Sequence, residues 1–121
     1  MSRNHEKLRV FQLADSLVLL VYRHTTSFPV TERFGLQSQV RRAAVSVATN
    51  IVEGCARRSR PDYARFVDIA LSSATETDYL LDLSRRLDML SPAAYAECRK
   101  CASQLLPGLQ KLLQSIETLE P

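Results

Sequence analysis

Hydrophobic residues recur at intervals of three and four along most of the chain, with polar residues between them. This spacing is typical of amphipathic helices, and its interruptions predict four of them, at about residues 7–26, 36–56, 60–89 and 92–119. No useful length of sequence alternates with the period of two that strands require. We therefore expect an all-α fold, an up-down-up-down antiparallel four-helix bundle with short loops. It should form a single domain over residues 1–121, with frayed ends at 1–6 and 120–121.

The residues between these stretches favour helix ends. The pair Phe28-Pro29 ends the first helix, because the residue before a proline avoids helical dihedral angles. Gly54 can end the second, since glycine adopts left-handed dihedral angles at no steric cost. Ser59 and Ser91 are good N-caps, and a proline follows each closely. Within the fourth stretch, Pro107-Gly108 predicts a kink, because proline removes a backbone hydrogen bond.

The first and fourth predicted helices differ in how their apolar residues are distributed. The apolar surface of the first is wider than one bundle core requires: Val10, Phe11, Leu13, Ala14, Leu17, Val18, Leu20, Val21 and Tyr22. Either this helix is deeply buried or it also faces another subunit, and both interpretations remain open. The fourth helix carries a bundle seam in alternating steps of four and three: Cys98, Ala102, Leu105, Leu109, Leu112, Ile116 and Leu119.

The positive charge is concentrated in one part of the chain. The 121 residues carry a formal net charge of only +3 at pH 7, but seven arginines face two acids between Arg33 and Arg65. In the predicted bundle, the start of the first and third helices and the end of the second lie at one pole. The basic residues expected there are Arg3, Lys7, Arg9, Arg57, Arg58, Arg60 and Arg65. A solvated loop is one interpretation, and phosphate contact by planar, always-charged guanidinium groups is the other.

Several polar residues lie within or beside the apolar stripes of the second and third helices: Arg42, Asn50, Glu53, Ser73 and Glu76. An active site would use the two carboxylates as acid and base, but no partner base, metal or cofactor site accompanies them. We favour a structural polar network, because an unpaired buried charge is costly. In it, Arg42 pairs with Glu76 or Glu53, and Asn50 ties helix ends together.

The sequence predicts no metal or cofactor site. A di-iron site in a four-helix bundle needs Glu-x-x-His pairs, and neither His5 nor His24 has a glutamate three residues before it. Cys98-x-x-Cys101 resembles half a zinc site or a redox pair, but it stands alone within a regular helix pattern. Because a zinc site needs a second ligand pair, core or surface thiols are the simpler interpretation, as for Cys55. Since no glycine-rich phosphate loop, nucleophile motif or dinucleotide fingerprint occurs, we expect no enzymatic activity.

The cysteine count and the hydropathy indicate a compartment. Three cysteines, an odd number, without a signal peptide favour a reducing cytoplasm. The most apolar stretch, Val10 to Tyr22, contains Gln12, Asp15 and Ser16 and is too short to cross a membrane. We therefore expect a soluble cytoplasmic protein with no membrane partner.

The segment from Gln39 to Arg60 contains a specific motif, RRAAxSxxxNIxEG. Its residues are Arg41-Arg42-Ala43-Ala44, Ser46, Asn50-Ile51 and Glu53-Gly54, with further matches at Phe28-Pro29, Glu32, Gly35-Leu36, Arg58-Ser59, Ile69-Ala70, Ser73 and Glu76. In these residues the chain resembles the four-helix-bundle proteins encoded in intervening sequences of bacterial 23S ribosomal RNA genes. That family includes the accessory protein that works beside the reverse transcriptase of diversity-generating retroelements. The chain departs from the family pattern at Ser72, usually glycine, and at Leu71, often arginine.

The resemblance implies a basic oligomer, a closed ring of five subunits, that binds nucleic acid without a sequence code. We expect a non-enzymatic bundle that binds RNA or DNA through backbone phosphates. The candidate contacts are Lys7, Arg9, Arg57, Arg58, Arg60 and Arg65. An alternative is a scaffold for another polypeptide, such as a reverse transcriptase, with no direct role in nucleic-acid binding. A hydrolase or nuclease is a third hypothesis.

Overall fold

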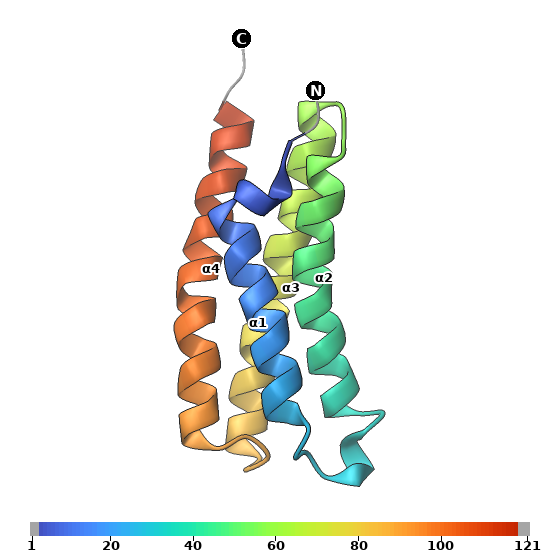
Figure 1. Cartoon of the computed structure of the whole chain (residues 1–121), viewed down its shortest axis with the longest axis vertical. Helices are drawn as coiled ribbons and strands as arrows, with labels where there is room; N and C mark the ends of the chain where they lie inside the picture. Colours follow the sequence, from blue (N-terminus) through green and yellow to red (C-terminus); the bar gives the residue numbers. More distant parts are fainter. Residues whose placement is uncertain (1–2, 119–121) are drawn as a thin grey trace.

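Four long helices pack side by side in the computed structural model, which describes residues 3–118 (Figure 1). The elements are a 3-10 turn η1 (His5–Lys7), α1 (Arg9–Thr25), a second turn η2 (Val30–Glu32), α2 (Leu36–Cys55), α3 (Arg60–Arg86) and α4 (Pro92–Thr118). Successive helices run in opposite directions, and α4 returns to pack against α1 (Figure 1). No strand occurs in residues 3–118. The predicted all-α four-helix bundle is thus confirmed.

The helix starts follow the predicted capping residues. The Ser59 hydroxyl accepts a hydrogen bond from the Asp62 amide at 3.2 Å and caps α3. At the start of α4 the Ser91 hydroxyl accepts one from the Ala94 amide at 3.1 Å. Each bond satisfies an amide that has no partner within its helix. Local polar chemistry therefore fixes where both long helices begin.

The third helix ends at Arg86, three residues earlier than the predicted end at Met89. Asp88 adopts a left-handed conformation with φ 60°, and the Met89 amide donates to the carbonyl of Ser84 at 2.9 Å. This is the hydrogen bonding of a Schellman motif, which reverses the chain after a helix. An aspartate takes the position that glycine usually occupies, so no glycine marks this helix end in the sequence.

The fourth helix runs from Pro92 to Thr118 as one element with Pro107 inside it, which agrees with the predicted extent of this helix. Gly108 lies against α1, because a Cβ atom built there would be 2.9 Å from Cγ1 of Val10. The absence of a side chain at Gly108 therefore allows α1 to approach α4. Leu119, the last residue of the predicted seam, lies outside the described residues.

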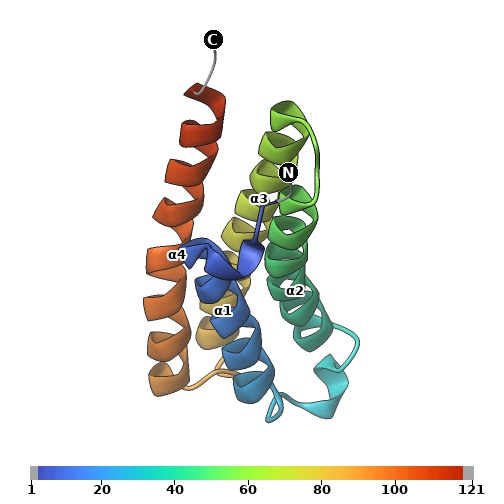
Figure 2. The same cartoon turned by 45° about the horizontal axis from the view of Figure 1, so that its top comes forward.

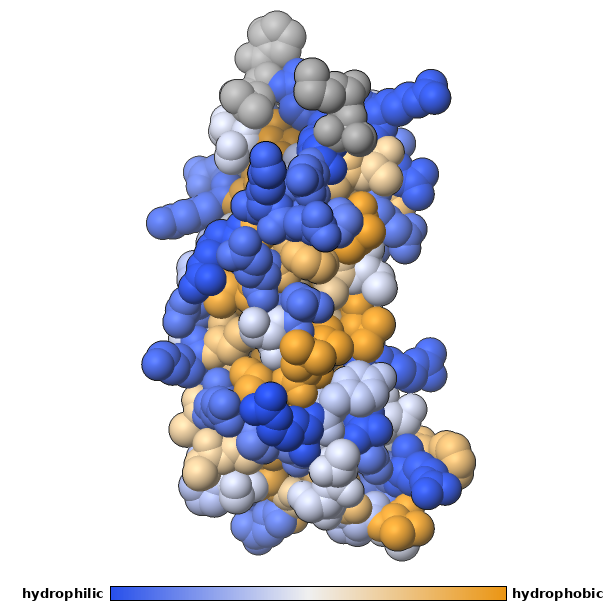
Figure 3. Space-filling model, viewed as in Figure 1, coloured by the Kyte–Doolittle hydropathy of each residue, from blue (hydrophilic) through white to orange (hydrophobic). Residues whose placement is uncertain are grey.

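The predicted apolar stripes form the core. On α4 the buried members are Cys98, Ala102, Leu105, Leu109 and Ile116, and on α2 they are Val40, Ala43, Ala44, Val47 and Ile51. The first helix buries Val10, Leu13, Ala14, Leu17 and Val21. However, it leaves Leu19 60% and Tyr22 42% exposed, and Figure 3 shows apolar surface over the middle of this face. In this single chain, α1 is therefore buried on one side only.

The segment before α1 crosses the end of the bundle between α4 and α2 (Figure 2). The Arg3 amide donates to the carbonyl of Cys55 at 3.2 Å, and the Asn4 side chain caps η1 by accepting from the Glu6 amide at 3.0 Å. Residues 3–6, which we expected to be frayed, are thus held against the end of α2. Residues 1–2 and 119–121 lie outside the described part of the chain. No helix within residues 3–118 is long and apolar enough to span a membrane.

Candidate nucleic-acid interface

Four arginines gather where α2 turns into α3, and we call them the loop arginines: Arg57, Arg58, Arg60 and Arg65. The loop is short because α2 ends at Cys55 and α3 begins at Arg60. Arg57, Arg58 and Arg65 are exposed, and Arg60 is half-buried. Arg3 adds a fifth guanidinium, whose Nη1 donates to the carbonyl of Arg57 at 2.8 Å. A hairpin of two rigid helices therefore presents a compact basic surface.

Aromatic rings support three of these guanidinium groups. Arg57 and Arg65 both lie over the ring of Phe66, with Cζ at 4.7 and 4.6 Å from its centroid. Arg3 lies over the buried ring of Tyr63 at 4.0 Å. The negative face of an aromatic ring attracts a cation and restricts its orientation. The charges are thus partly preorganised before any ligand binds.

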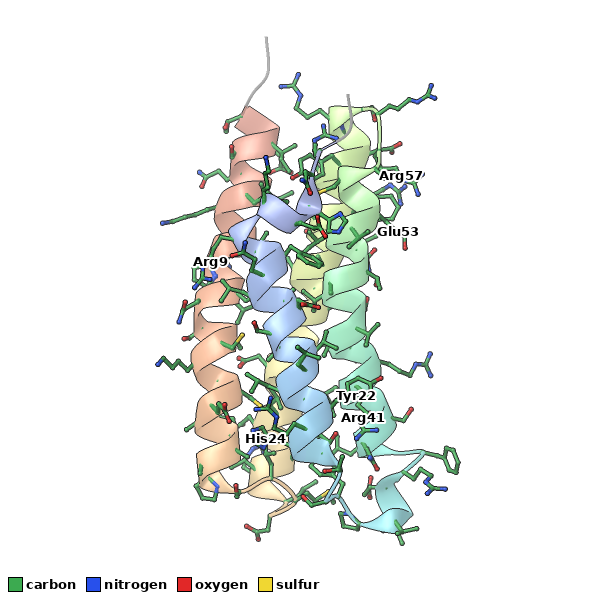
Figure 4. The ribbon with its side chains drawn as sticks, in the orientation of Figure 1. Arg9, Tyr22, His24, Arg41, Glu53 and Arg57 are labelled. Atoms are coloured by element: carbon green, nitrogen blue, oxygen red, sulfur yellow. The ribbon has the colours of Figure 1, made fainter. Side chains whose placement is uncertain are left out.

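Two carboxylates partly offset this charge. Arg57 pairs with Glu53 at 3.7 Å, and Arg65 pairs with Asp62 at 3.8 Å. Figure 4 shows Glu53 and Arg57 together near the end of α2. All four side chains are about half exposed, and exposed ion pairs contribute little free energy. A phosphate can therefore replace either carboxylate at low cost.

The structure does not bring all the predicted contacts together. Lys7 lies in η1, whereas Arg9 starts α1 and its Nη2 donates to Oε1 of Gln104 on α4 at 3.2 Å. Arg9 therefore lies on the α1–α4 side of the bundle, away from Arg57 (Figure 4). We predicted that seven basic residues lie together at one pole of the bundle, and for Arg9 this prediction is wrong. The reason is length: α1 has 17 residues and α3 has 27, so α1 begins below the α2–α3 loop (Figure 1).

The predicted polar network also takes a different form. The hydroxyls of Ser46 and Ser73 join α2 to α3 at 2.8 Å. Nδ2 of Asn50 donates to the carbonyl and the hydroxyl of Ser46, at 2.8 and 3.0 Å. Asn50 thus supports a contact along the helices and does not tie helix ends. Ser46 and Ser73 have small side chains, which allow α2 and α3 to approach closely, and Ser46 belongs to the sequence motif although it was not assigned to the predicted network.

The predicted pairing of Arg42 with Glu76 or Glu53 is wrong. Glu53 pairs with Arg57, and Arg42 makes no ion pair within residues 3–118. Arg42 and Glu76 instead line the same surface hollow, of about 400 Å³, together with Ser73. Both side chains are exposed, so the desolvation cost that would demand a pair does not arise.

The three cysteines are free, buried thiols. Burial raises the pKa of Cys98 to about 11, with a further contribution from the charges of Glu97 and Cys101. Burial also raises the pKa of Cys55 and of Cys101, and Cys101 donates to the carbonyl of Leu13 at 3.2 Å. Residues 3–118 contain no cluster of three or more side chains that could hold a metal ion. Cys98 and Cys101 pack in the core of α4.

Comparison with known proteins now adds to this geometry. No curated protein that was compared matches the chain. Among solved structures, the chain is similar to a protein with unknown function from the S23 ribosomal protein family of Bacteroides thetaiotaomicron. The two share 23% sequence identity with a TM-score of 0.78, over 87% of this chain and 95% of that one, and this likeness shows the fold. The family model of the 23S rRNA-intervening sequence protein matches residues 6–111. The chain therefore belongs to the family of 23S rRNA-intervening sequence proteins.

Proposed function

We propose that this protein is a non-enzymatic, basic, oligomeric bundle that binds RNA or DNA through backbone phosphates. The observation that carries the proposal is the cluster of loop arginines, in which Arg57 and Arg65 lie over one aromatic ring at the end of a rigid hairpin. Guanidinium groups match phosphate with two parallel hydrogen bonds. Contacts of this kind position a nucleic acid without reading its sequence.

One subunit alone would bind weakly. With three or four phosphate contacts, the logarithm of the association constant falls with the logarithm of the salt concentration with a slope of about −3. The affinity for nucleic acid therefore falls about 60-fold between 50 and 200 mM salt. A ring of five subunits, which the resemblance implies, would repeat the same surface around an axis. Several weak contacts to one nucleic acid then combine into a much higher avidity. The exposed Leu19 of α1 supports self-association, because subunit contact would remove this apolar side chain from water.

The experiment is a titration of fluorescent RNA and duplex DNA at several salt concentrations, with the mass checked by light scattering. The variant Arg57→Glu with Arg58→Glu should lose binding to duplex RNA and duplex DNA and keep its helicity and mass. The control is Lys100→Glu with Lys111→Glu, which makes the same change in net charge on exposed positions of α4 and should leave most binding intact. Unchanged binding by the first variant would exclude the loop arginines.

A protein partner is the second candidate function, and the apolar surface of α1 favours it. Leu19 and Tyr22 offer a contact that another polypeptide, such as a reverse transcriptase, could cover. An apolar interface responds little to salt, whereas phosphate binding weakens steeply. The same titration therefore separates the two candidates. We place either function in the cytoplasm, where free thiols stay reduced.

A further inference from the structure

A second basic surface lies at the opposite end of the bundle from the loop arginines. A groove of about 450 Å³ opens between the end of α1 and the start of α2. Its lining includes Tyr22, Arg33, Phe34, Arg41 and Arg42, and we call this site the arginine–aromatic groove. Its volume is within the range that small ligands occupy in proteins.

The groove is positively charged. Among the residues that the structure describes, three arginines and no carboxylate line it. Arg33 and Arg42 are exposed and make no ion pair within residues 3–118. The nearby carboxylate of Glu32 accepts from the Leu36 amide at 2.9 Å, and Glu76 lines the adjacent hollow. Two guanidinium groups therefore face solvent without a partner in the described part of the chain, as an anion-binding site requires.

The third guanidinium is held in place. Nε of Arg41 donates to the hydroxyl of Thr25 at 2.8 Å, and Nη2 donates to the carbonyl of Tyr22 at 3.3 Å. Thr25 is completely buried, and its hydroxyl donates to the carbonyl of Val21 at 2.7 Å. Arg41 also lies over the ring of Tyr22, 4.5 Å from its centroid, as Figure 4 shows. These contacts engage Nε and Nη2 of Arg41 and fix the direction of its guanidinium group.

An aromatic ring stands beside these charges. Phe34 lines the groove and is 90% exposed. A single exposed apolar side chain is ordinary, but this one lies in a turn among three guanidinium groups. Positive charge with an accessible ring is the combination by which proteins bind single-stranded nucleic acid: arginines contact phosphate, and the ring stacks on a base. A duplex does not offer this contact, because its base faces are covered by their neighbours.

We propose that the arginine–aromatic groove binds one nucleotide unit of a single strand, with the base on Phe34 and the phosphate on Arg33, Arg41 and Arg42. This site shares no residue with the loop arginines. Arg42 and Arg57 are fifteen residues apart, which is roughly 22 Å at 1.5 Å per residue. One long single strand could occupy both sites and gain avidity, whereas a duplex would use the loop arginines alone. A free nucleotide carries the same chemistry.

The test uses the full chain with Arg57→Glu and Arg58→Glu as background, so that the groove is measured alone. Probes are a fluorescein-labelled ten-nucleotide oligouridylate, an RNA duplex of equal length and unlabelled uridine monophosphate. The background protein should bind the single strand and not the duplex. Adding Phe34→Ala should weaken binding about 5- to 150-fold, the usual effect of losing one stacked base. Adding Val30→Ala, a control at an 82% exposed position in the same connection, should change nothing.

The outcomes separate this proposal from the proposed function. If wild type binds both probes and the background protein binds neither, the groove proposal is overturned and the loop arginines stand. The groove proposal would also be overturned if adding Phe34→Ala to the background protein left its affinity for the single strand unchanged. The same holds if adding Arg33→Gln together with Arg42→Gln left this affinity unchanged. If uridine monophosphate competes as strongly as the oligonucleotide at equal nucleotide concentration, the ligand is a free nucleotide. If uridine monophosphate competes far more weakly, the ligand is the single strand. Circular dichroism verifies folding, which Phe34→Ala should not affect at so exposed a position.

Discussion

The buried thiol of Cys98 makes stability depend on pH in the alkaline range. Burial raises its pKa from 9.0 to about 11, so on raising the pH the unfolded chain loses this proton first. The contribution of Cys98 to stability is therefore fully present below pH 9 and is lost as the pH rises toward 11. With 1.36 kcal/mol per pKa unit, the loss is about 1 kcal/mol at pH 10 and approaches about 3 kcal/mol above pH 11.

Urea unfolding at pH 7 and pH 10, followed by circular dichroism, measures this effect. Between pH 7 and pH 10, the free energy of unfolding should fall by about 1 kcal/mol more in wild type than in Cys98→Ala. The reason is that the variant lacks the titrating thiol but retains every other titrating group. The cavity left by Cys98→Ala lowers stability equally at both pH values and cancels. An equal loss in the two proteins would show that Cys98 is not protonated in a dry core, and the core-thiol interpretation of the Cys98-x-x-Cys101 pair would be wrong.

Three further predictions concern the bundle and the groove. Leu105 is fully buried, so Leu105→Ala should lower the unfolding free energy by about 2–5 kcal/mol; a loss below about 1 kcal/mol in urea unfolding would contradict the packing. Ser59→Ala removes the cap of α3 and should lower the unfolding free energy by about 1 kcal/mol in the same assay. Ser59→Asp can still cap the helix and should retain most of this stability. Thr25→Val removes the acceptor that holds Arg41 and should weaken single-strand binding several-fold with little change in the unfolding midpoint, whereas unchanged binding would show that Arg41 needs no such support.

Local chemistry made most of the fold predictable. Serine caps followed by prolines fix the starts of α3 and α4, and the three-and-four spacing of apolar residues identifies the buried side of each helix. The end of α3 was misplaced because Asp88, not a glycine, adopts the left-handed conformation. The close approach of α1 to α4 at Gly108 is a contact between two helices, which the spacing of residues along one helix does not reveal.

The candidate sites were less predictable, because they depend on relative helix length and on contacts between distant residues. The loop arginines are adjacent in sequence and were found, but the shortness of α1 separates Arg9 from them. The arginine–aromatic groove was missed because Tyr22 and Arg41 are nineteen residues apart. Phe34 was the feature of the sequence that indicated this groove. It is a large apolar residue beside Gly35 in a polar connection, and it does not fit the three-and-four spacing of the core residues.

The most direct test of nucleic-acid binding is the salt dependence of RNA affinity for wild type and for Arg57→Glu with Arg58→Glu, with mass measured in the same buffer. We predict an oligomer that binds at low salt, with a slope of log K against log salt of about −3 or steeper, and a variant of the same mass that has lost most of this binding to duplex probes. Absence of binding at low salt, or an affinity that neither salt nor the two substitutions change, would contradict the account.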